Sequence, residues 1–189
     1  LLEAWEHLDG WSLTDKGTTL RRIYHECDLV IAECLHEGLF DDLDPASLAG
    51  LASVFGYEHR SPNPPPPPWF PSATVRKRYQ RIEALVSELH ADEETAALPL
   101  TRVPDPTFLA LAHAWAAGED LGEVLANEDI TAGDFVRVVR QVIDLLRQIG
   151  DVATVPGTSS AARAAADALH RGVVAVSAQA VEGDDGQGG

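Results

Sequence analysis

Arg137, Arg140, Gln141 and Asp144 are polar residues that recur at helical spacing between residues 131 and 151. Guanidinium and amide groups along one helix face can hold the phosphates or base edges of a nucleic-acid strand without reading its sequence. The same pattern is typical of a surface helix whose polar side is only solvated. Three arginines and three aspartates balance each other in this stretch, so the face has no net charge. The residues alone leave both interpretations open.

The element that must position these side chains is a long amphipathic helix, predicted over residues 131–151. Thr131 is suited to cap its start, and Gly150 is placed to end or loosen its last turn. At roughly 1.5 Å per residue the helix would be about 30 Å long, enough to cross a small domain. Its apolar residues fall on one unbroken stripe: Phe135, Val138, Val139, Val142, Leu145, Leu146 and Ile149.

Shorter helical patterns surround this central helix, and no segment has the alternation or turn spacing of a sheet. The predicted fold class is therefore all-α, a helical bundle around one long central helix. Residues 11–14 are expected to be extended. The other helices are expected over Leu1–Leu8, over Asp15–Gly38, after Asp44-Pro45, after Ser72, over Phe108–Ala117, after Asp120 and over Thr158–Arg171.

A proline-rich loop over residues 61–71 interrupts the helical pattern. Its five consecutive prolines favour polyproline II and cannot continue a helix. We interpret the loop as a stiff spacer whose far end is fixed to the core by Trp69 and Phe70; a ligand for an SH3-like groove is the alternative. The end of the chain is rich in Gly, Asp and Gln, and residues 176–189 are expected to form a disordered tail.

The 189-residue chain has a net charge of −16. A free-standing nucleic-acid binder normally presents a basic patch, because neutralising phosphates supplies most of its affinity. The acidic balance therefore argues against tight autonomous binding, but it allows a few contacts inside a larger assembly. The basic cluster near residues 76–81 is expected to pair with neighbouring acidic surface rather than with phosphate. No apolar run reaches the roughly 20 residues of a membrane span.

No catalytic constellation is expected. A phosphate-binding P-loop needs Gly-Lys followed by Ser or Thr, and neither Lys16 nor Lys77 follows a glycine. The cysteines and histidines lack the spacing of a metal site, so no metal ligand is assigned. Cys27 and Cys34 would lie roughly 10 Å apart on one helix, too far for a disulfide. We expect two buried thiols in a reducing compartment and a cytoplasmic location.

Three stretches of the chain, in order and spacing, resemble the DSHCT domain: Leu13–Tyr24 running into Asp28–Glu33, Trp115–Leu121 followed by Val124-Leu125, and Gly133–Arg140 continuing to Asp144–Ile149. This is the C-terminal helical domain of the DExH-box RNA helicases of the Ski type, including the bacterial HelY type. The resemblance covers roughly residues 13 to 175. Gln141 and Ile143-Asp144 depart from the basic and acidic residues that other members often carry there.

The resemblance implies that residues 15–175 form the helical bundle of a longer helicase, and that residues 1–14 end a preceding winged-helix region or connect to it. The bundle would pack on RecA-like motor domains of the same polypeptide, which bind ATP and Mg²⁺, and this chain itself would hold no cofactor. The long helix over residues 131–151 would lie beneath single-stranded RNA, with DNA as an open alternative. Its expected RNA-binding residues are Arg137, Arg140, Gln141 and Asp144.

Two classes of function remain. The first is an accessory domain of an ATP-dependent RNA helicase, which is not catalytic by itself. The second is an acidic helical protein-interaction module that docks a partner such as a nuclease. Binding of single-stranded RNA across a salt series discriminates them, because direct phosphate contacts weaken steeply as salt rises.

Overall fold

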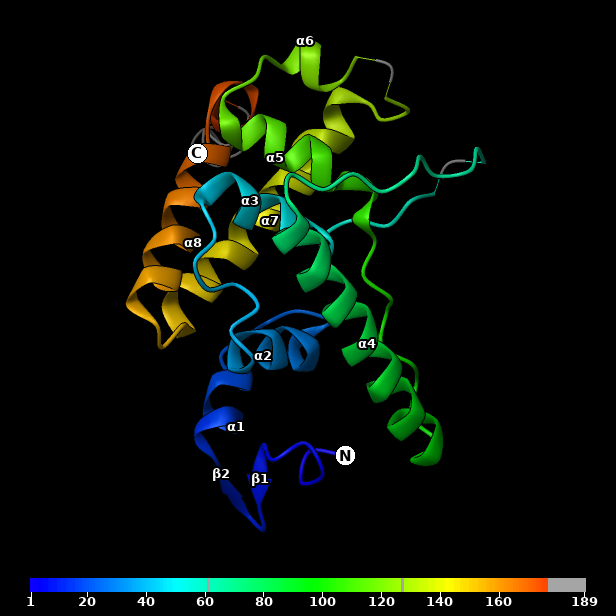
Figure 1. Cartoon of the computed structure of the whole chain (residues 1–189), viewed down its shortest axis with the longest axis vertical. Helices are drawn as coiled ribbons and strands as arrows, with labels where there is room; N and C mark the ends of the chain where they lie inside the picture. Colours follow the sequence, from blue (N-terminus) through cyan, green and yellow to red (C-terminus); the bar gives the residue numbers. More distant parts are fainter. Residues whose placement is uncertain (61, 127, 177–189) are drawn as a thin grey trace, which may run out of the picture.

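The computed structural model describes residues 1–60, 62–126 and 128–176. These ranges are mostly helical, which confirms the predicted all-α class, although they include one small two-stranded sheet (Figure 1). The tail expected over 176–189 lies outside them, apart from Val176. In chain order the elements are β1 (Leu8–Asp9), β2 (Ser12–Leu13), α1 (Asp15–Leu20), α2 (Asp28–His36), α3 (Pro45–Ser53), α4 (Ala73–Thr95), the 3-10 turn η1 (Pro106–Phe108), α5 (Leu109–Ala117), α6 (Leu121–Val124), α7 (Ala132–Val152) and α8 (Pro156–Leu169).

Helix α7 runs through the upper part of the bundle, with α8 and α3 packed along it (Figure 1). The hydroxyl oxygen of Thr131 accepts a hydrogen bond from the backbone N–H of Asp134 at 3.1 Å, which confirms the predicted N-cap. The predicted apolar stripe is buried along its whole length, together with Ile143 and Val152. Burial of this stripe holds α7 in the bundle and leaves its polar face outside.

Gly150 lies in the last turn of α7 but does not end the helix, which continues past it to Val152. The glycine is buried where α8 approaches α7. The Ser159 hydroxyl donates to the Gly150 carbonyl at 2.5 Å, and a Cβ at this position would lie 3.0 Å from Cγ of Arg163. Glycine at this position therefore permits close packing of two helices rather than ending one.

Aromatic rings pack at the N-terminal end of α7. The Phe135 ring centroid lies 5.6 Å from that of Phe108 and 5.7 Å from that of Trp115. The Trp115 indole N–H donates to the Leu169 carbonyl at 2.9 Å, and the Arg171 guanidinium lies 3.6 Å from the centre of the same ring. These contacts join the end of α8 to α5 and α7.

Helix α4 lies beside α2 and α3 and begins after Ser72, whose hydroxyl oxygen accepts from the Val75 N–H at 3.2 Å. The basic cluster in its first turns was expected to pair with acidic surface, and this holds for Arg81. Its guanidinium contacts Glu37 at 2.6 Å and Glu88 at 2.7 Å. The apolar side of α4 is buried, at Val75, Tyr79, Ile82, Val86 and Leu89.

The single long helix expected near the N-terminus is wrong, since residues 21–27 separate α1 from α2. Within this break the Tyr24 N–H donates to Oε1 of Gln148 at 2.7 Å, and the Cys27 N–H donates to Nδ1 of His25 at 3.0 Å. Side chains thus replace the backbone carbonyls that a continuous helix would supply. The break places the segment 21–27 against α7.

Both cysteines are buried and neither forms a disulfide, as expected. Burial raises the pKa of the Cys27 thiol to about 11, and it raises the pKa of Cys34 well above its ordinary value. Both thiols are therefore protonated at neutral pH and poor nucleophiles.

The first residues differ from the prediction. Residues 1–7 form turns instead of the short helix expected over Leu1–Leu8, and they lead into an antiparallel hairpin of β1 and β2 (Figure 1). The extended conformation expected for residues 11–14 is confirmed at β2. Strands of two residues are too short to show an alternating pattern, so the sequence does not predict them.

A buried charged cluster fixes this N-terminal segment to α2. The Glu33 carboxylate accepts from Nε2 of His7 at 2.7 Å and from Nζ of Lys16 at 2.8 Å. Lys16 also donates to the Trp5 carbonyl at 3.0 Å. Burial opposes ionisation of Glu33, but hydrogen bonds and positive charge from His7 and Lys16 outweigh it and lower the pKa of this carboxyl.

Gly17 packs against the same segment. A Cβ at this position would lie only 2.0 Å from the backbone oxygen of His7, which itself accepts a hydrogen bond from the Thr14 N–H at 3.2 Å. We expect Gly17→Ala to lower the free energy of unfolding by about 1–3 kcal/mol, because backbone must move to admit the methyl group. Urea denaturation followed by circular dichroism measures the change. Gly122→Ala is the control, since no atom outside its chain neighbours and its own helix backbone lies within 4 Å of the added Cβ. An equal loss in both variants would contradict the close-packing explanation.

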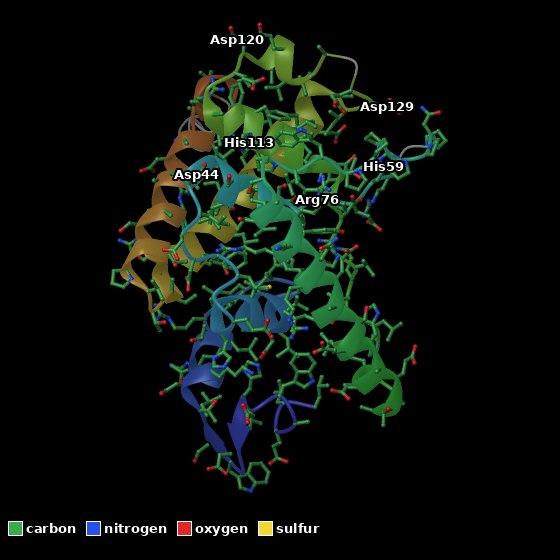
Figure 2. All side chains as sticks on the ribbon, viewed as in Figure 1. Asp44, His59, Arg76, His113, Asp120 and Asp129 are labelled. Carbon is green, nitrogen blue, oxygen red and sulfur yellow. The ribbon has the colours of Figure 1, made fainter. Side chains whose placement is uncertain are left out.

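The proline-rich loop leaves the body of the bundle as an arm (Figure 1). Its residues 62–69 are exposed, and His59 lies where the arm begins (Figure 2). At the far end the Phe70 ring lies 5.5 Å from Tyr79, whereas Trp69 stays about half exposed. The expected anchoring to the core therefore holds for Phe70 more than for Trp69.

Candidate functional site

Two adjoining hollows form a groove along the outer side of α7. The first has a volume of about 190 Å³ and the second about 480 Å³. Both are lined by Glu26, Gly56 and Gln141, so they are parts of one groove. Its walls are α7 on one side, and the segments that precede α2 and follow α3 on the other. We call this feature the α7 groove.

The α7 wall presents Arg137, Gln141, Asp144 and Gln148, which recur every three or four residues and therefore follow one line along the helix. The Arg137 side chain is 61% exposed, and its Nη2 lies 3.3 Å from Oδ1 of Asp134. An exposed pair of this kind contributes about 0–1 kcal/mol. The Arg137 guanidinium can therefore exchange this contact for a ligand at little cost.

The four residues predicted as a binding set do not all lie together. Arg137, Gln141 and Asp144 line the α7 groove, but Arg140 is half-buried and lines neither hollow. Asp144 is exposed, and its Oδ1 lies 3.7 Å from Nη1 of Arg147. The structure thus places three of the four side chains on one surface and sets Arg140 to one side of it.

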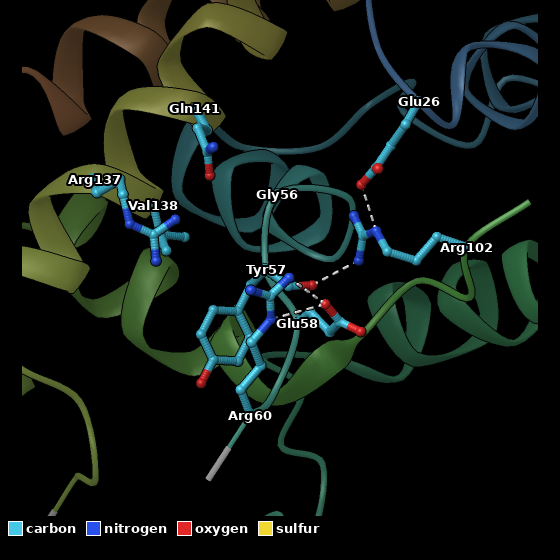
Figure 3. A pocket seen from close by; sticks show the side chains of 9 residues that line it. All are labelled: Glu26, Gly56, Tyr57, Glu58, Arg60, Arg102, Arg137, Val138 and Gln141. Atoms are coloured by element: carbon cyan, nitrogen blue, oxygen red, sulfur yellow. Dashed lines mark hydrogen bonds and ion pairs between the residues drawn. The ribbon is translucent and has the colours of Figure 1, made fainter.

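Arg102 holds the opposite wall (Figure 3). Its Nε donates to Oε1 of Glu26 at 2.5 Å, its Nη1 donates to the Tyr57 carbonyl at 2.8 Å, and its Nη2 donates to the Phe55 carbonyl. One guanidinium therefore joins the segment before α2 to the segment after α3. The Arg102 guanidinium is hydrogen-bonded within the wall, so it holds the wall in place rather than being free for a ligand.

Arg60 stands at the mouth of the first hollow. Its side chain is 84% exposed and contacts Glu58 at 2.8 Å. Because exposed ion pairs contribute little, this guanidinium is also able to turn toward a ligand. The α7 groove therefore has two adaptable arginines, Arg137 and Arg60, and one structural arginine, Arg102.

Residues 24–26 form part of the wall of the second hollow. Tyr24 is 82% exposed and lines the hollow with Gln141 and Asp144. The neighbouring His25 turns inward, and its ring centroid lies 6.5 Å from that of Phe55 in an edge contact. Burial lowers the pKa of His25, which favours the neutral imidazole. The segment is therefore anchored by His25 while Tyr24 points outward.

Comparison with known proteins decides the family. A family model of the DSHCT (NUC185) domain matches residues 10–177, which is most of the chain. This chain belongs to the DSHCT family. The resemblance inferred from the three sequence stretches is therefore confirmed.

Relatives of this DSHCT chain are helicases. The probable helicase HelY of Mycobacterium leprae is 40% identical over 180 residues, which cover 90% of this chain and 20% of the relative. The probable helicase HelY of Mycobacterium tuberculosis (strain ATCC 25618 / H37Rv) is 38% identical over 192 residues, covering 94% and 21%. The exosome RNA helicase MTR4 of Homo sapiens is 25% identical over 150 residues, covering 76% and 14%. The DSHCT chain spans about a fifth of the length of the HelY relatives.

Lys16 is not free to bind a phosphate in the described part of the DSHCT chain. Nζ of Lys16 forms an ion pair with Glu33 and donates a hydrogen bond to the Trp5 carbonyl. Within residues 1–60, 62–126 and 128–176, no three side chains of the types that bind metals come together. None of the helices in these ranges is both long and apolar enough to cross a bilayer.

Sequence reasoning missed half of the α7 groove. Arg102, Gly56 and Arg60 lie in loops, where no periodicity marks a residue as facing a site. Tyr24 and Glu26 lie in or beside the first stretch that resembles the DSHCT family. The sequence did not indicate that Tyr24 is exposed, because Tyr24 falls at helical spacing among the apolar residues of the helix expected over 15–38.

Proposed function

We propose that this DSHCT chain is the C-terminal accessory domain of an ATP-dependent RNA helicase, acting in the cytoplasm, and that the α7 groove contacts single-stranded RNA. The names of its relatives support the helicase assignment. In this proposal RecA-like motor domains of the same polypeptide bind ATP and Mg²⁺, and the helical bundle packs on them. The chain contributes a surface for the strand and no catalytic residue.

The observation that carries the RNA contact is the line of exposed polar side chains on α7 above a groove. Guanidinium and amide groups can hold a strand without reading its sequence. Carboxylates of Glu26, Glu58 and Asp144 accompany the arginines in this groove. Such a mixed surface holds a polyanion weakly, which suits a strand that must move through a helicase. Arg140, one turn from Arg137 and Asp144, is proposed as a cation beside the groove rather than within it.

Substitution of Arg137 tests this proposal in the full-length product of the gene that encodes the chain. A hydrogen bond to a charged group contributes about 1.5–3 kcal/mol, so Arg137→Ala should raise the RNA concentration for half-maximal ATPase stimulation by about tenfold or more. It should also make the slope of log affinity against log salt shallower by about 0.7, the value for one phosphate contact with a single strand.

Arg147→Ala is the matched control, because Arg147 lies on the same helix, is similarly exposed at 57%, and lines neither hollow. We expect its effect to be small, and that of Arg140→Ala to lie between the two. If RNA stimulates the ATPase of Arg137→Ala and of Arg147→Ala at the same concentration, the groove does not contact RNA.

The proline-rich arm favours a second candidate function, the docking of a protein partner such as a nuclease. Its exposed prolines form a surface that aromatic-lined grooves can bind. Deleting residues 62–68 in the full-length protein separates the two functions. If the deletion variant no longer co-purifies with a nuclease but keeps normal RNA-stimulated ATPase, the arm docks the partner. If both nuclease binding and RNA-stimulated ATPase are retained, the arm has no role in either function.

A further inference from the structure

Tyr24 is an exposed aromatic side chain at the edge of the α7 groove. It is 82% exposed, although Ile23 and Cys27 in the same segment are almost fully buried. Among the described residues no aromatic ring is stacked on it. Its exposure is therefore not explained by packing within this chain.

The position of Tyr24 is fixed by α7 itself. Its backbone N–H donates to Oε1 of Gln148 at 2.7 Å, and Nη2 of the nearby Arg22 donates to the Asp151 carbonyl at 3.0 Å. On the other side of Tyr24, the inward contact of His25 with Phe55 holds the segment. The ring is thus exposed on a backbone that is tied to α7 at two points, so little conformational entropy is lost when a ligand binds to it.

The hollow beside Tyr24 has a volume of about 480 Å³, within the roughly 300–1,000 Å³ usual for ligand sites. Its polar lining includes Gln141, Asp144 and Gln148. Amide and carboxylate groups of this kind can bond base edges, and an aromatic face can stack on any base. Its carboxylates, Glu26 and Asp144, are paired with Arg102 and Arg147, and no arginine among the described residues lines this hollow, so it offers no free positive charge.

We propose that Tyr24 is a base-stacking residue and that the second hollow of the α7 groove is a nucleobase subsite. This rests on the proposed function, and it assigns the two hollows different tasks. The first hollow, with Arg137 and Arg60, receives phosphate, whereas the second receives a base stacked on Tyr24. Stacking does not depend on positive charge, which is how a chain of net charge −16 can hold a polyanion.

Affinity for single-stranded RNA and for an abasic RNA backbone of equal length tests the proposal in the full-length protein. Tyr24→Ala should weaken binding of base-bearing RNA by about tenfold, in line with the loss of one stacked base, and leave abasic RNA unchanged. Tyr24→Phe should restore most of the loss, since it keeps the ring. Arg137→Ala should weaken binding of both probes.

Photocrosslinking to RNA that contains 5-iodouridine locates the contact. We expect an adduct on Tyr24 in the wild type, none in Tyr24→Ala, and unchanged total crosslinking in Trp11→Ala. Trp11 is the control because it is fully exposed in the turn between β1 and β2 and lines neither hollow.

The outcomes separate the two proposals. If Arg137→Ala weakens RNA binding while Tyr24→Ala does not, the stacking proposal is overturned and the RNA contact of α7 stands. If Tyr24→Ala weakens base-bearing and abasic RNA equally, the residue has a structural role and the nucleobase subsite is likewise overturned. If neither variant changes binding, both proposals fail.

Discussion

Glu33→Ala is expected to lower the free energy of unfolding by about 3–5 kcal/mol, the usual cost of removing one partner from a buried ion pair. Glu33 and His7 are almost fully buried, and the Lys16 side chain is only 13% exposed. The variant leaves the Nε2–H of His7 without its acceptor and leaves the ammonium of Lys16 with only the Trp5 carbonyl. Urea denaturation followed by circular dichroism measures the loss.

Glu37→Ala is the control for this experiment. Glu37 lies just after the same helix and pairs with Arg81, but both side chains are about a third exposed. An exposed pair contributes about 0–1 kcal/mol, so this variant should remain close to the wild type. A loss in Glu37→Ala as large as in Glu33→Ala would contradict the argument from burial.

The pH dependence of stability follows from the same carboxyl group. The pKa of Glu33 is lower in the folded chain than its ordinary value of 4.5. The unfolded chain therefore binds the proton more tightly, and the contribution of Glu33 is complete above pH 4.5 and is lost as the pH falls through the folded pKa. Glu33→Gln should remove this part of the acid dependence. A profile that is unchanged in Glu33→Gln would show that other carboxyls govern it.

The second large effect is expected at Arg102. Arg102→Ala removes the ion pair with Glu26 and leaves the Phe55 and Tyr57 carbonyls without this donor. Each hydrogen bond to a charged group contributes about 1.5–3 kcal/mol, and partial hydration recovers some of it, so we expect a total loss of about 2–4 kcal/mol. The wall of the α7 groove should loosen as well, because the segments before α2 and after α3 lose their common contact.

Arg60→Ala provides a matched comparison, since Arg60 lines the same hollow but has a side chain that is 84% exposed. We expect it to change the free energy of unfolding by less than about 0.5 kcal/mol. Hydrogen exchange of residues 54–58 measures the local effect and should rise in Arg102→Ala only. Equal stability of the two variants would mean that Arg102 does not hold the wall.

Long amphipathic elements could be predicted from the sequence. The stripe from Phe135 to Ile149 repeats over several turns, so one misplaced residue does not change the prediction, and the same is true of α4. The cap at Thr131 was predicted because the chemistry of a cap is local. The exposure of Arg137 follows from the same helical periodicity, because Arg137 falls on the polar side of α7.

Features that depend on distant partners could not be predicted. The break between α1 and α2 contains Tyr24, whose backbone N–H bonds Gln148, a residue far away in the chain. Arg102 occupies a loop and finds carbonyl acceptors that only the folded chain places beside it. Gly150 fits a helix end by local rules, but the approach of α8 explains it instead. The assignment of Arg137, Arg140, Gln141 and Asp144 to RNA remains a prediction.

The packing of α8 along α7 has a consequence for synthesis. Ribosomes add about 5–20 residues per second, so the 14 residues of α8 take roughly one to three seconds to follow α7. During that interval the apolar side of α7 that α8 will cover faces water. A nascent chain that pauses at this stage exposes an apolar helix face, which is the kind of surface that chaperones bind and that promotes aggregation.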